Sequence, residues 1–99
     1  METIHTIGRR KTSVARVYLD KGKGKILINN KKFNDYFSTA SLQFKISQPF
    51  ILTNTEKNYD LKVIVKGGGN NGQVEAIRLG ISRALCKINE EYRPVLKTE

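Results

Sequence analysis

The sequence predicts a single α+β domain, and two kinds of pattern lead to that prediction. Several short segments alternate apolar and polar residues with a period of two, which is typical of strands that bury one face. One long segment near the C-terminus repeats apolar residues with the helical period of 3.6. The 99 residues suit one layered core. Because no repeat or long linker divides the chain, residues 1–99 are expected to form one domain.

Two N-terminal segments are expected to be strands. The first covers residues 3–7, and a basic turn at residues 8–11 breaks it. The second covers residues 13–19, in which Ala15, Val17 and Leu19 share one face. This alternation indicates a strand with one face in the core and the other face open.

The next segment is expected to complete a hairpin. Residues 21–24, which read Lys-Gly-Lys-Gly, are interpreted as its charged tip, and residues 25–28 as its returning strand. Asn29 and Asn30 supply a second turn, since asparagine tolerates the left-handed conformation.

The middle of the chain is expected to hold short helices and another strand. A helical turn is predicted at residues 33–37, whose aromatic side chains are expected to pack in the core, although they could stack on bases. A short helix is expected to start at Ser41, which can cap it, and to be limited by Pro49. Residues 59–65 alternate again and are predicted to be a strand.

The clearest predicted element is a helix over residues 73–89. Gly80 lies inside it at a cost of about 1 kcal/mol relative to alanine, which suggests that close packing requires it. Arg83 points nearly opposite the apolar stripe, so it is expected to be free for solvent or a ligand. The stripe consists of Val74, Ile77, Ile81, Leu85 and Ile88.

The charge of the chain points to a polyanionic partner. There are 18 Lys and Arg residues against 9 Asp and Glu residues, a formal net charge of +9. Residues 8–32 hold nine of the basic residues and a single acidic one, Asp20, a net of +8. This concentration favours anion binding over an ordinary solvated face. A membrane partner is not predicted, since no apolar stretch approaches the length of about 20 residues that spans a bilayer.

The reactive side chains do not predict an enzyme. His5 is the only histidine and Cys86 the only cysteine, and neither has an obvious catalytic partner. His5 is interpreted as a surface or edge residue and Cys86 as a packing residue. One histidine and one cysteine cannot make the usual zinc site. No catalytic residue, metal ligand, cofactor or small-molecule substrate is therefore expected.

A glycine-rich segment is the strongest local motif. Gly67, Gly69 and Gly72 form G-x-G-x-x-G between a predicted strand and a predicted helix, the usual context of a nucleotide-binding turn. A dinucleotide fold also needs a second parallel strand, and no apolar run follows the helix to supply one. A Walker loop is excluded because no Lys-Ser or Lys-Thr follows the glycines. The segment is either a plain connection or, as favoured here, a set of backbone N–H groups that meet a phosphate of a large polyanion.

Several segments together resemble one known family. The glycine segment at residues 67–73 leads into Ala76, Gly80 and residues 82–85, and the opening at residues 8–17 matches as well. In this order the chain resembles the ninth protein of the small ribosomal subunit, in its bacterial or organellar form. Further matching segments are residues 24–26 with Asn29, residues 35–37, Gln48 with Pro49, and residues 92–94.

The resemblance implies a fold, a role and a location. The fold is a two-layer one with a mixed sheet and helices on one face, like the second domain of ribosomal protein five. It includes a left-handed crossover, an exception to the usual handedness. The implied role is structural: to bind and organise small-subunit rRNA in the head, beside neighbouring head proteins and near the peptidyl-tRNA site. The implied location is the ribosome, in the cytoplasm or in an organelle.

The residues expected to contact rRNA fall into three groups. The arginines of the basic turn are expected to bind phosphates through two N–H groups each. The lysines of the Lys-Gly-Lys tip are expected to form a second phosphate contact. The glycine loop, with Arg83 nearby, is expected to contribute backbone amides. The predicted contacts are Gly8, Arg9, Arg10, Lys11, Arg16, Lys21, Lys23, Lys25, Lys66, Gly67, Gly68, Gly69, Asn70, Asn71, Gln73 and Arg83.

Two expectations qualify this role. The family normally continues into a basic tail that reaches the tRNA in the peptidyl site, whereas this sequence stops at Lys97, Thr98 and Glu99, so no residue here is assigned a tRNA contact. The alternative function is a free-standing RNA-binding protein, which would bind unstructured oligonucleotides as well as folded rRNA.

Overall fold

The structure, a computed structural model, describes residues 2–96. Residues 97–99, at which the sequence stops, lie outside the described residues. In chain order the elements are β1 (Ile4–Arg10), β2 (Ser13–Lys21), β3 (Ile26–Ile28), β4 (Lys31–Lys32), α1 (Phe33–Tyr36), α2 (Ala40–Leu52), β5 (Tyr59–Lys66), α3 (Asn70–Ile88), the 3-10 turn η1 (Glu90–Tyr92) and α4 (Arg93–Leu96).

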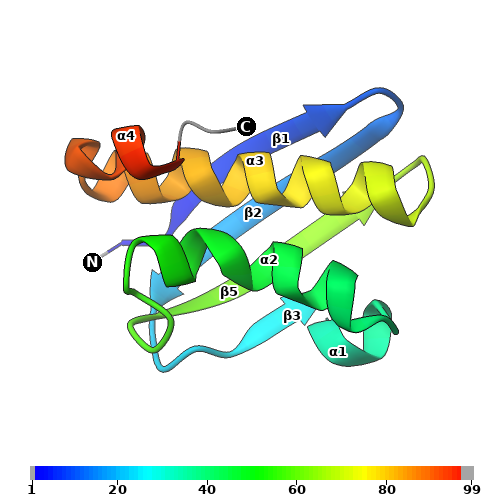
Figure 1. Cartoon of the computed structure of the whole chain (residues 1–99), viewed down its shortest axis with the longest axis horizontal. Helices are drawn as coiled ribbons and strands as arrows, with labels where there is room; N and C mark the ends of the chain where they lie inside the picture. Colours follow the sequence, from blue (N-terminus) through cyan, green and yellow to red (C-terminus); the bar gives the residue numbers. More distant parts are fainter. Residues whose placement is uncertain (1, 97–99) are drawn as a thin grey trace.

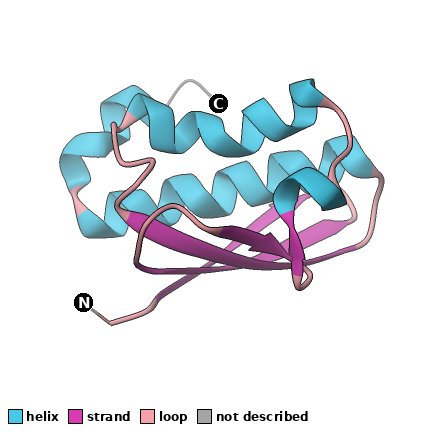
Figure 2. Ribbon diagram, turned by 90° about the horizontal axis from the view of Figure 1, so that it is seen from below, coloured by secondary structure: helices cyan, strands magenta, loops and turns pink. Residues whose placement is uncertain are grey.

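The strands form one mixed sheet, and the helices cover one of its faces (Figures 1 and 2). The strand order is β1-β2-β5-β3-β4, with β3 and β5 parallel and the other neighbours antiparallel. In Figure 1 the connection from β3 to β5 passes over the helix side in the left-handed sense. The predicted α+β class, with a mixed sheet and helices on one face, is confirmed.

The predicted hairpin around residues 21–24 is wrong. Strand β2 pairs with β5, and β5 pairs with β3, so β5 lies between the two segments that were expected to be neighbours. The register sets Val17 and Ile28 on either side of Val63, and all three side chains are fully buried. Strand β5 takes this place because its apolar positions complete the core from both sides.

The N-terminal strand is longer than predicted. Strand β1 continues to Arg10, which pairs with Ser13, so the turn is reduced to Lys11 and Thr12. Lys11 has a φ of 53°, as the tight turns between antiparallel strands require. Two of the basic residues expected in a turn, Arg9 and Arg10, therefore lie on a strand.

Helix α2 also differs from the prediction at both ends. Its N-cap is Thr39, whose hydroxyl accepts from the Leu42 amide at 3.3 Å, and not Ser41. Pro49 lies inside the helix, which continues to Leu52. The helix tolerates the proline because Pro49 and Phe50 are buried, so the packing of this turn offsets the missing backbone donor.

Helix α3 packs against β1 and β2 where two glycines meet. A Cβ on Gly8 would lie 1.9 Å from the Ala76 carbonyl oxygen, and one on Gly80 would lie 2.5 Å from Cγ2 of Val17. The Thr6 hydroxyl, buried at the same contact, donates to the Gly80 carbonyl at 2.6 Å. The packing role predicted for Gly80 is confirmed.

Candidate nucleic-acid interface

Two loops that are far apart in sequence meet at one end of the molecule. The Ser13 hydroxyl donates to the Gly67 carbonyl at 2.9 Å. A Cβ on Gly67 would lie 2.2 Å from the Thr12 carbonyl oxygen, and one on Gly68 would lie 2.2 Å from Oγ of Ser13. The β1–β2 turn and the β5–α3 connection are thus packed together. We call this surface the glycine end; it comprises Arg9, Arg10, Lys11, Thr12, Ser13, Lys66, Gly67, Gly68, Gly69, Asn70 and Asn71.

The backbone of the glycine end exposes the start of α3. Gly67 and Gly68 have φ values of 82° and 67°, which only glycine adopts without strain. The helix begins at Asn70, earlier than predicted, and its N-cap Gly69 supplies no side-chain cap. The first N–H groups of a helix have no intrahelical partner and carry partial positive charge. Helix α3, 19 residues long, therefore presents an uncapped N-terminus at the surface.

A chain of side-chain hydrogen bonds holds the glycine loop in place. The Asn29 side chain pairs with the backbone of Val65 as a neighbouring strand would, at 2.9 Å and 3.1 Å, and also donates to the Tyr36 hydroxyl at 3.2 Å. Tyr36 donates to Oε1 of Gln73 at 3.0 Å, and the Gln73 amide donates to the Gly67 carbonyl at 3.2 Å. Gln73, which was predicted to contact rRNA, positions the loop with its side chain.

The cations of the glycine end have no internal partners. Arg9, Arg10, Lys11 and Lys66 are all exposed. Within residues 2–96 none of these four side chains makes an ion pair or a side-chain hydrogen bond. Because their charges are not neutralised inside the protein, they are available to an external anion.

The structure gives Gly8 a role that differs from the predicted one. It was expected to let the backbone approach a phosphate, but it is buried and faces α3, where any side chain would meet the backbone of Ala76 and Gly80. The close approach that this glycine permits is between strand and helix.

The second basic point lies at the opposite end of β2. Lys21, Lys23 and Lys25 are exposed there, about 27 Å from Ser13 along the strand. The backbone N–H groups of Lys23, Gly24 and Lys25 converge on Oδ1 of Asp60, at 3.0, 3.2 and 2.9 Å. The hydrogen bond from Lys25 contributes most, ahead of that from Lys23, to lowering the pKa of Asp60. The carboxylate thus shapes this loop from within.

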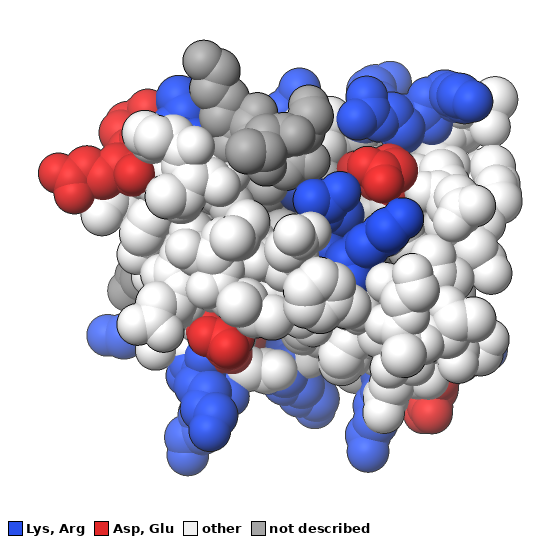
Figure 3. Space-filling view, in the orientation of Figure 1, with Lys and Arg blue, Asp and Glu red and all other residues white. Residues whose placement is uncertain are grey.

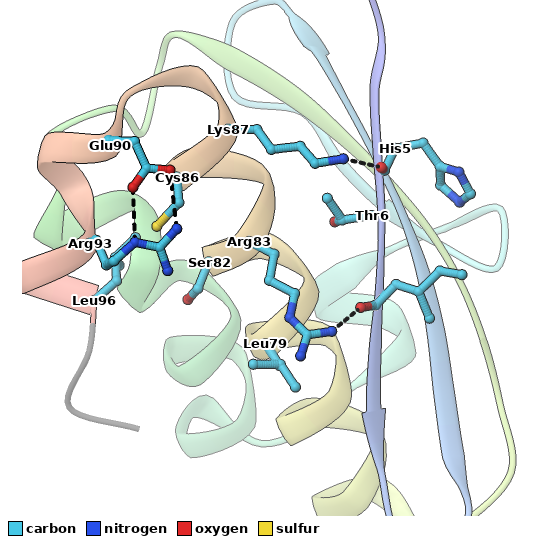
Figure 4. Close-up of a pocket in the computed structure, with 11 residues that line it drawn as sticks. His5, Thr6, Leu79, Ser82, Arg83, Cys86, Lys87, Glu90, Arg93 and Leu96 are labelled. Carbon is cyan, nitrogen blue, oxygen red and sulfur yellow. Dashed lines mark hydrogen bonds and ion pairs between the residues drawn. The ribbon is translucent and has the colours of Figure 1, made fainter.

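Arg83 does not lie near the glycine loop, and it is not free. Its Nη1 donates to the Ile7 carbonyl at 2.8 Å, and Asn70 is about 20 Å away along the helix axis. Next to it Lys87 Nζ reaches the His5 carbonyl at 3.5 Å, so α3 covers the outer edge of β1 (Figure 4). The prediction of an unengaged Arg83 is therefore wrong.

The groove beside this edge is lined by Cys86, Glu90 and Arg93, among other residues (Figure 4). Cys86 is buried there, in agreement with a packing role. Glu90 pairs with Arg93 at 2.9 Å, and this hydrogen bond and charge lower the pKa of Glu90. No cluster of three potential metal ligands occurs among residues 2–96.

Sequence reasoning missed the residues that organise the glycine end. Ser13, Asn29 and Tyr36 hold the loop through contacts 54, 36 and 37 positions apart in the chain. The only signal was that Ser13, Asn29 and Tyr36 all belong to segments that carry the family resemblance. The core packing predicted for the aromatic residues at 33–37 is confirmed, since Phe37 is fully buried with Tyr36 edge-on to it at 4.8 Å.

None of the helices within residues 2–96 has the length and hydrophobicity that a bilayer crossing requires.

Comparison with known proteins agrees with the resemblance. The family model described as ribosomal protein S9/S16 matches residues 8–99. Proteins named "Small ribosomal subunit protein uS9" from Christiangramia forsetii, Cytophaga hutchinsonii and Flavobacterium psychrophilum are 54%, 52% and 50% identical over 99 residues. Each alignment covers 100% of this chain and 77% of the relative. The chain therefore belongs to the ribosomal protein S9/S16 family.

Proposed function

We propose that this protein is a structural constituent of the small ribosomal subunit and binds small-subunit rRNA through the glycine end. The observation that carries the proposal is the convergence there of unpaired cations with the uncapped N-terminus of α3. Family membership supports it, as do the relatives whose name places them in the small ribosomal subunit. Binding rRNA in this way requires no catalytic group.

The glycine end suits folded RNA because its parts recognise phosphate in different ways. Arg9 and Arg10 can each hold a phosphate through two parallel N–H bonds, which a lysine cannot do. Lys11 and Lys66 add point charges. The backbone N–H groups of Asn70 and Asn71 can donate hydrogen bonds to a further phosphate without a side chain. Because the Tyr36–Gln73 hydrogen bond fixes the loop in advance, little order has to be imposed on binding.

Further predicted contacts lie outside the glycine end. Arg16 projects from β2 on the face of the sheet that the helices leave open. The lysines at 21, 23 and 25 form a separate point at the far end, where a second RNA segment could be held. A position in the subunit head near the peptidyl-tRNA site, with head proteins as neighbours, follows from the family resemblance. Within the cell, the ribosome of the cytoplasm or of an organelle would be the site of action.

Salt dependence of binding tests the proposal. The triple variant Arg9→Gln, Arg10→Gln, Lys11→Gln is expected to bind a transcript of the small-subunit head rRNA more weakly. Its plot of log affinity against log salt should be shallower by about 0.7–0.9 for each lost phosphate contact. The matched control neutralises Lys32, Lys45 and Lys57, which lie outside the glycine end. An unchanged slope in the first triple variant would refute the assignment.

A competition experiment separates the alternative functions. A free-standing binder of single-stranded RNA would be displaced equally well by short unstructured oligonucleotides and by folded rRNA. A nucleotide-dependent enzyme would instead bind a dinucleotide or a nucleoside triphosphate saturably. We expect folded rRNA to compete best, because the glycine end combines contacts from β1, β5 and α3 in one fixed shape.

A further inference from the structure

The face of the sheet opposite the helices has no cover among residues 2–96 (Figure 2). Strand pairing arranges its side chains in rows across β1, β2 and β5. From the glycine end outward, the rows are Arg9, Val14 and Lys66; then Ile7, Arg16 and Ile64; then His5, Tyr18 and Lys62. We call these nine residues the open face.

The open face carries cations with apolar residues between them. Arg9, Arg16, Lys62 and Lys66 are exposed, whereas Ile7, Val14 and Tyr18 are half-buried, and Ile64 is 37% exposed. No acidic residue lies in the three rows; Asp20 and Asp60 pair with each other in the row beyond Tyr18. Within residues 2–96 the four cations make no ion pair. The net positive charge of the open face therefore favours binding of a polyanion.

The row of His5, Tyr18 and Lys62 contains an aromatic pair on β1 and β2. The His5 ring stacks on the Tyr18 ring with centroids 4.5 Å apart and planes 6° apart, and Lys62 is the next residue across the sheet. Aromatic side chains beside cations form the usual platform for unpaired bases, because every base has a π face. Sheets also serve RNA binding in this way in other folds.

We propose that the open face is a second RNA-contact surface, which takes an unpaired RNA segment running away from the glycine end. Phosphates would lie along Arg9 or Lys66, then Arg16, then Lys62, and a base would stack on the His5–Tyr18 pair. Successive rows are about 7 Å apart, comparable with the spacing of phosphates in an extended strand. The inference rests on the proposed rRNA-binding function and adds to it a site built from His5, Tyr18, Lys62 and Ile64.

The helix side differs in character. Figure 3 shows a broad uncharged area over this side, with most of the basic side chains toward its margin. Two of the large apolar side chains exposed there are Phe44 and Ile51 of α2, at 55% and 44%. RNA is accordingly assigned to the sheet side, and Phe44 offers a matched aromatic control on the other side.

A tryptophan reporter tests the stacking directly, since the chain contains no Trp. Tyr18→Trp keeps an aromatic ring at the stacking position, and its fluorescence should be quenched as bases of the head rRNA transcript stack on it. Phe44→Trp should keep its fluorescence on binding. Tyr18→Leu should weaken binding about tenfold without changing the salt slope. Circular dichroism and urea denaturation confirm that each variant is folded.

A charge variant tests the phosphate track. Arg16→Gln with Lys62→Gln should lower the salt slope by about 1.4–1.8. If the parent does not bind the rRNA, the proposed function itself fails. If the parent binds and the glycine-end triple variant loses slope, but Tyr18→Trp is not quenched and the double variant keeps the full slope, then the open face is not an RNA site. Loss of a protein neighbour from the assembled subunit with rRNA affinity intact would likewise overturn the inference.

Discussion

The Tyr36 hydroxyl donates to Oε1 of Gln73 at 3.0 Å, and this bond joins helix α1 to the first turn of α3. On one side Tyr36 accepts from Asn29, and on the other Gln73 donates to the Gly67 carbonyl. The bond serves to fix the shape of the glycine loop, so its loss should affect that loop first.

Replacing the tyrosine tests this link. Tyr36→Phe is expected to lower the free energy of unfolding by about 0.5–1.5 kcal/mol, the usual net value of one hydrogen bond. Amide exchange in the segment 67–71 should accelerate more than in the rest of α3. The control is Tyr59→Phe, since the Tyr59 hydroxyl makes no side-chain hydrogen bond within residues 2–96. Equal acceleration in both variants would show that Tyr36 does not organise the loop.

The contact between β1 and α3 predicts unequal effects at two glycines. Gly8→Ala places a Cβ 1.9 Å from the Ala76 carbonyl oxygen, so strand and helix must separate, at a cost of about 1–3 kcal/mol or more. Gly69→Ala meets nothing within 4 Å and should cost less than about 1 kcal/mol, as an N-cap change does. Urea denaturation measures both. Similar losses in the two variants would contradict the packing described here.

Acid should loosen the loop around Asp60. Its pKa is lowered chiefly by the backbone hydrogen bond from Lys25. The ionised group therefore stabilises the fold above its unfolded pKa of about 3.8, and this contribution is lost as pH falls through the lower folded value. Asp60→Asn should be less stable than the parent at neutral pH and should lack this part of the acid dependence. The carboxyl carbon shift of Asp60 during an NMR titration gives the pKa directly.

Asp35 supplies the comparison for that titration. Its side chain is exposed on α1 and accepts from no loop amide within residues 2–96, so Asp35→Asn should leave the acid dependence that Asp60 causes in place. If Asp60→Asn kept that dependence, Asp60 would not be its cause.

The outer edge of β1 is expected to resist pairing with other strands because Arg83 and Lys87 bind its carbonyls. Arg83→Ala with Lys87→Ala opens this edge, and exposed edges associate. Sedimentation velocity over a range of concentrations should then show more self-association than in the parent. The control removes the same charge from exposed loops, as Lys23→Ala with Lys57→Ala. If both double variants self-associated to the same extent, the lower net charge would explain the association and the open edge of β1 would not.

The elements of this fold that depend on local pattern could be predicted from the sequence. Alternation identified the buried positions of β2 and β5, and the 3.6 period identified α3 and its apolar stripe. The packing of Gly80 followed from its helix cost alone. These signals are local, because a residue's neighbours on the same element decide its face.

The remainder depended on contacts distant in sequence. A charged Lys-Gly-Lys-Gly tip is as suitable for a hairpin as for the loop that encloses Asp60, and only the pairing of β5 decides between them. Pro49 suggested a helix end because proline lacks a backbone donor. The burial of this turn, which offsets that loss, depends on residues distant in the sequence and could not be predicted. Gln73 was placed beside the glycine loop, but its hydrogen bond to Gly67 could not be foreseen. Arg83 was placed near that loop as well, whereas it binds the carbonyl of Ile7 on β1.

Because β5 lies between β2 and β3, the order of synthesis constrains the order of folding. The β1–β2 hairpin can form early, but β3 cannot join β1 and β2 in the sheet until β5, which ends at residue 66, has been synthesised. Long-range pairings of this kind are slow and expose strand edges meanwhile. The strand that closes the sheet leads directly into the glycine loop and α3. The nascent protein thus completes its core and its phosphate-binding end in the same late event, so an unfinished chain offers RNA no finished site.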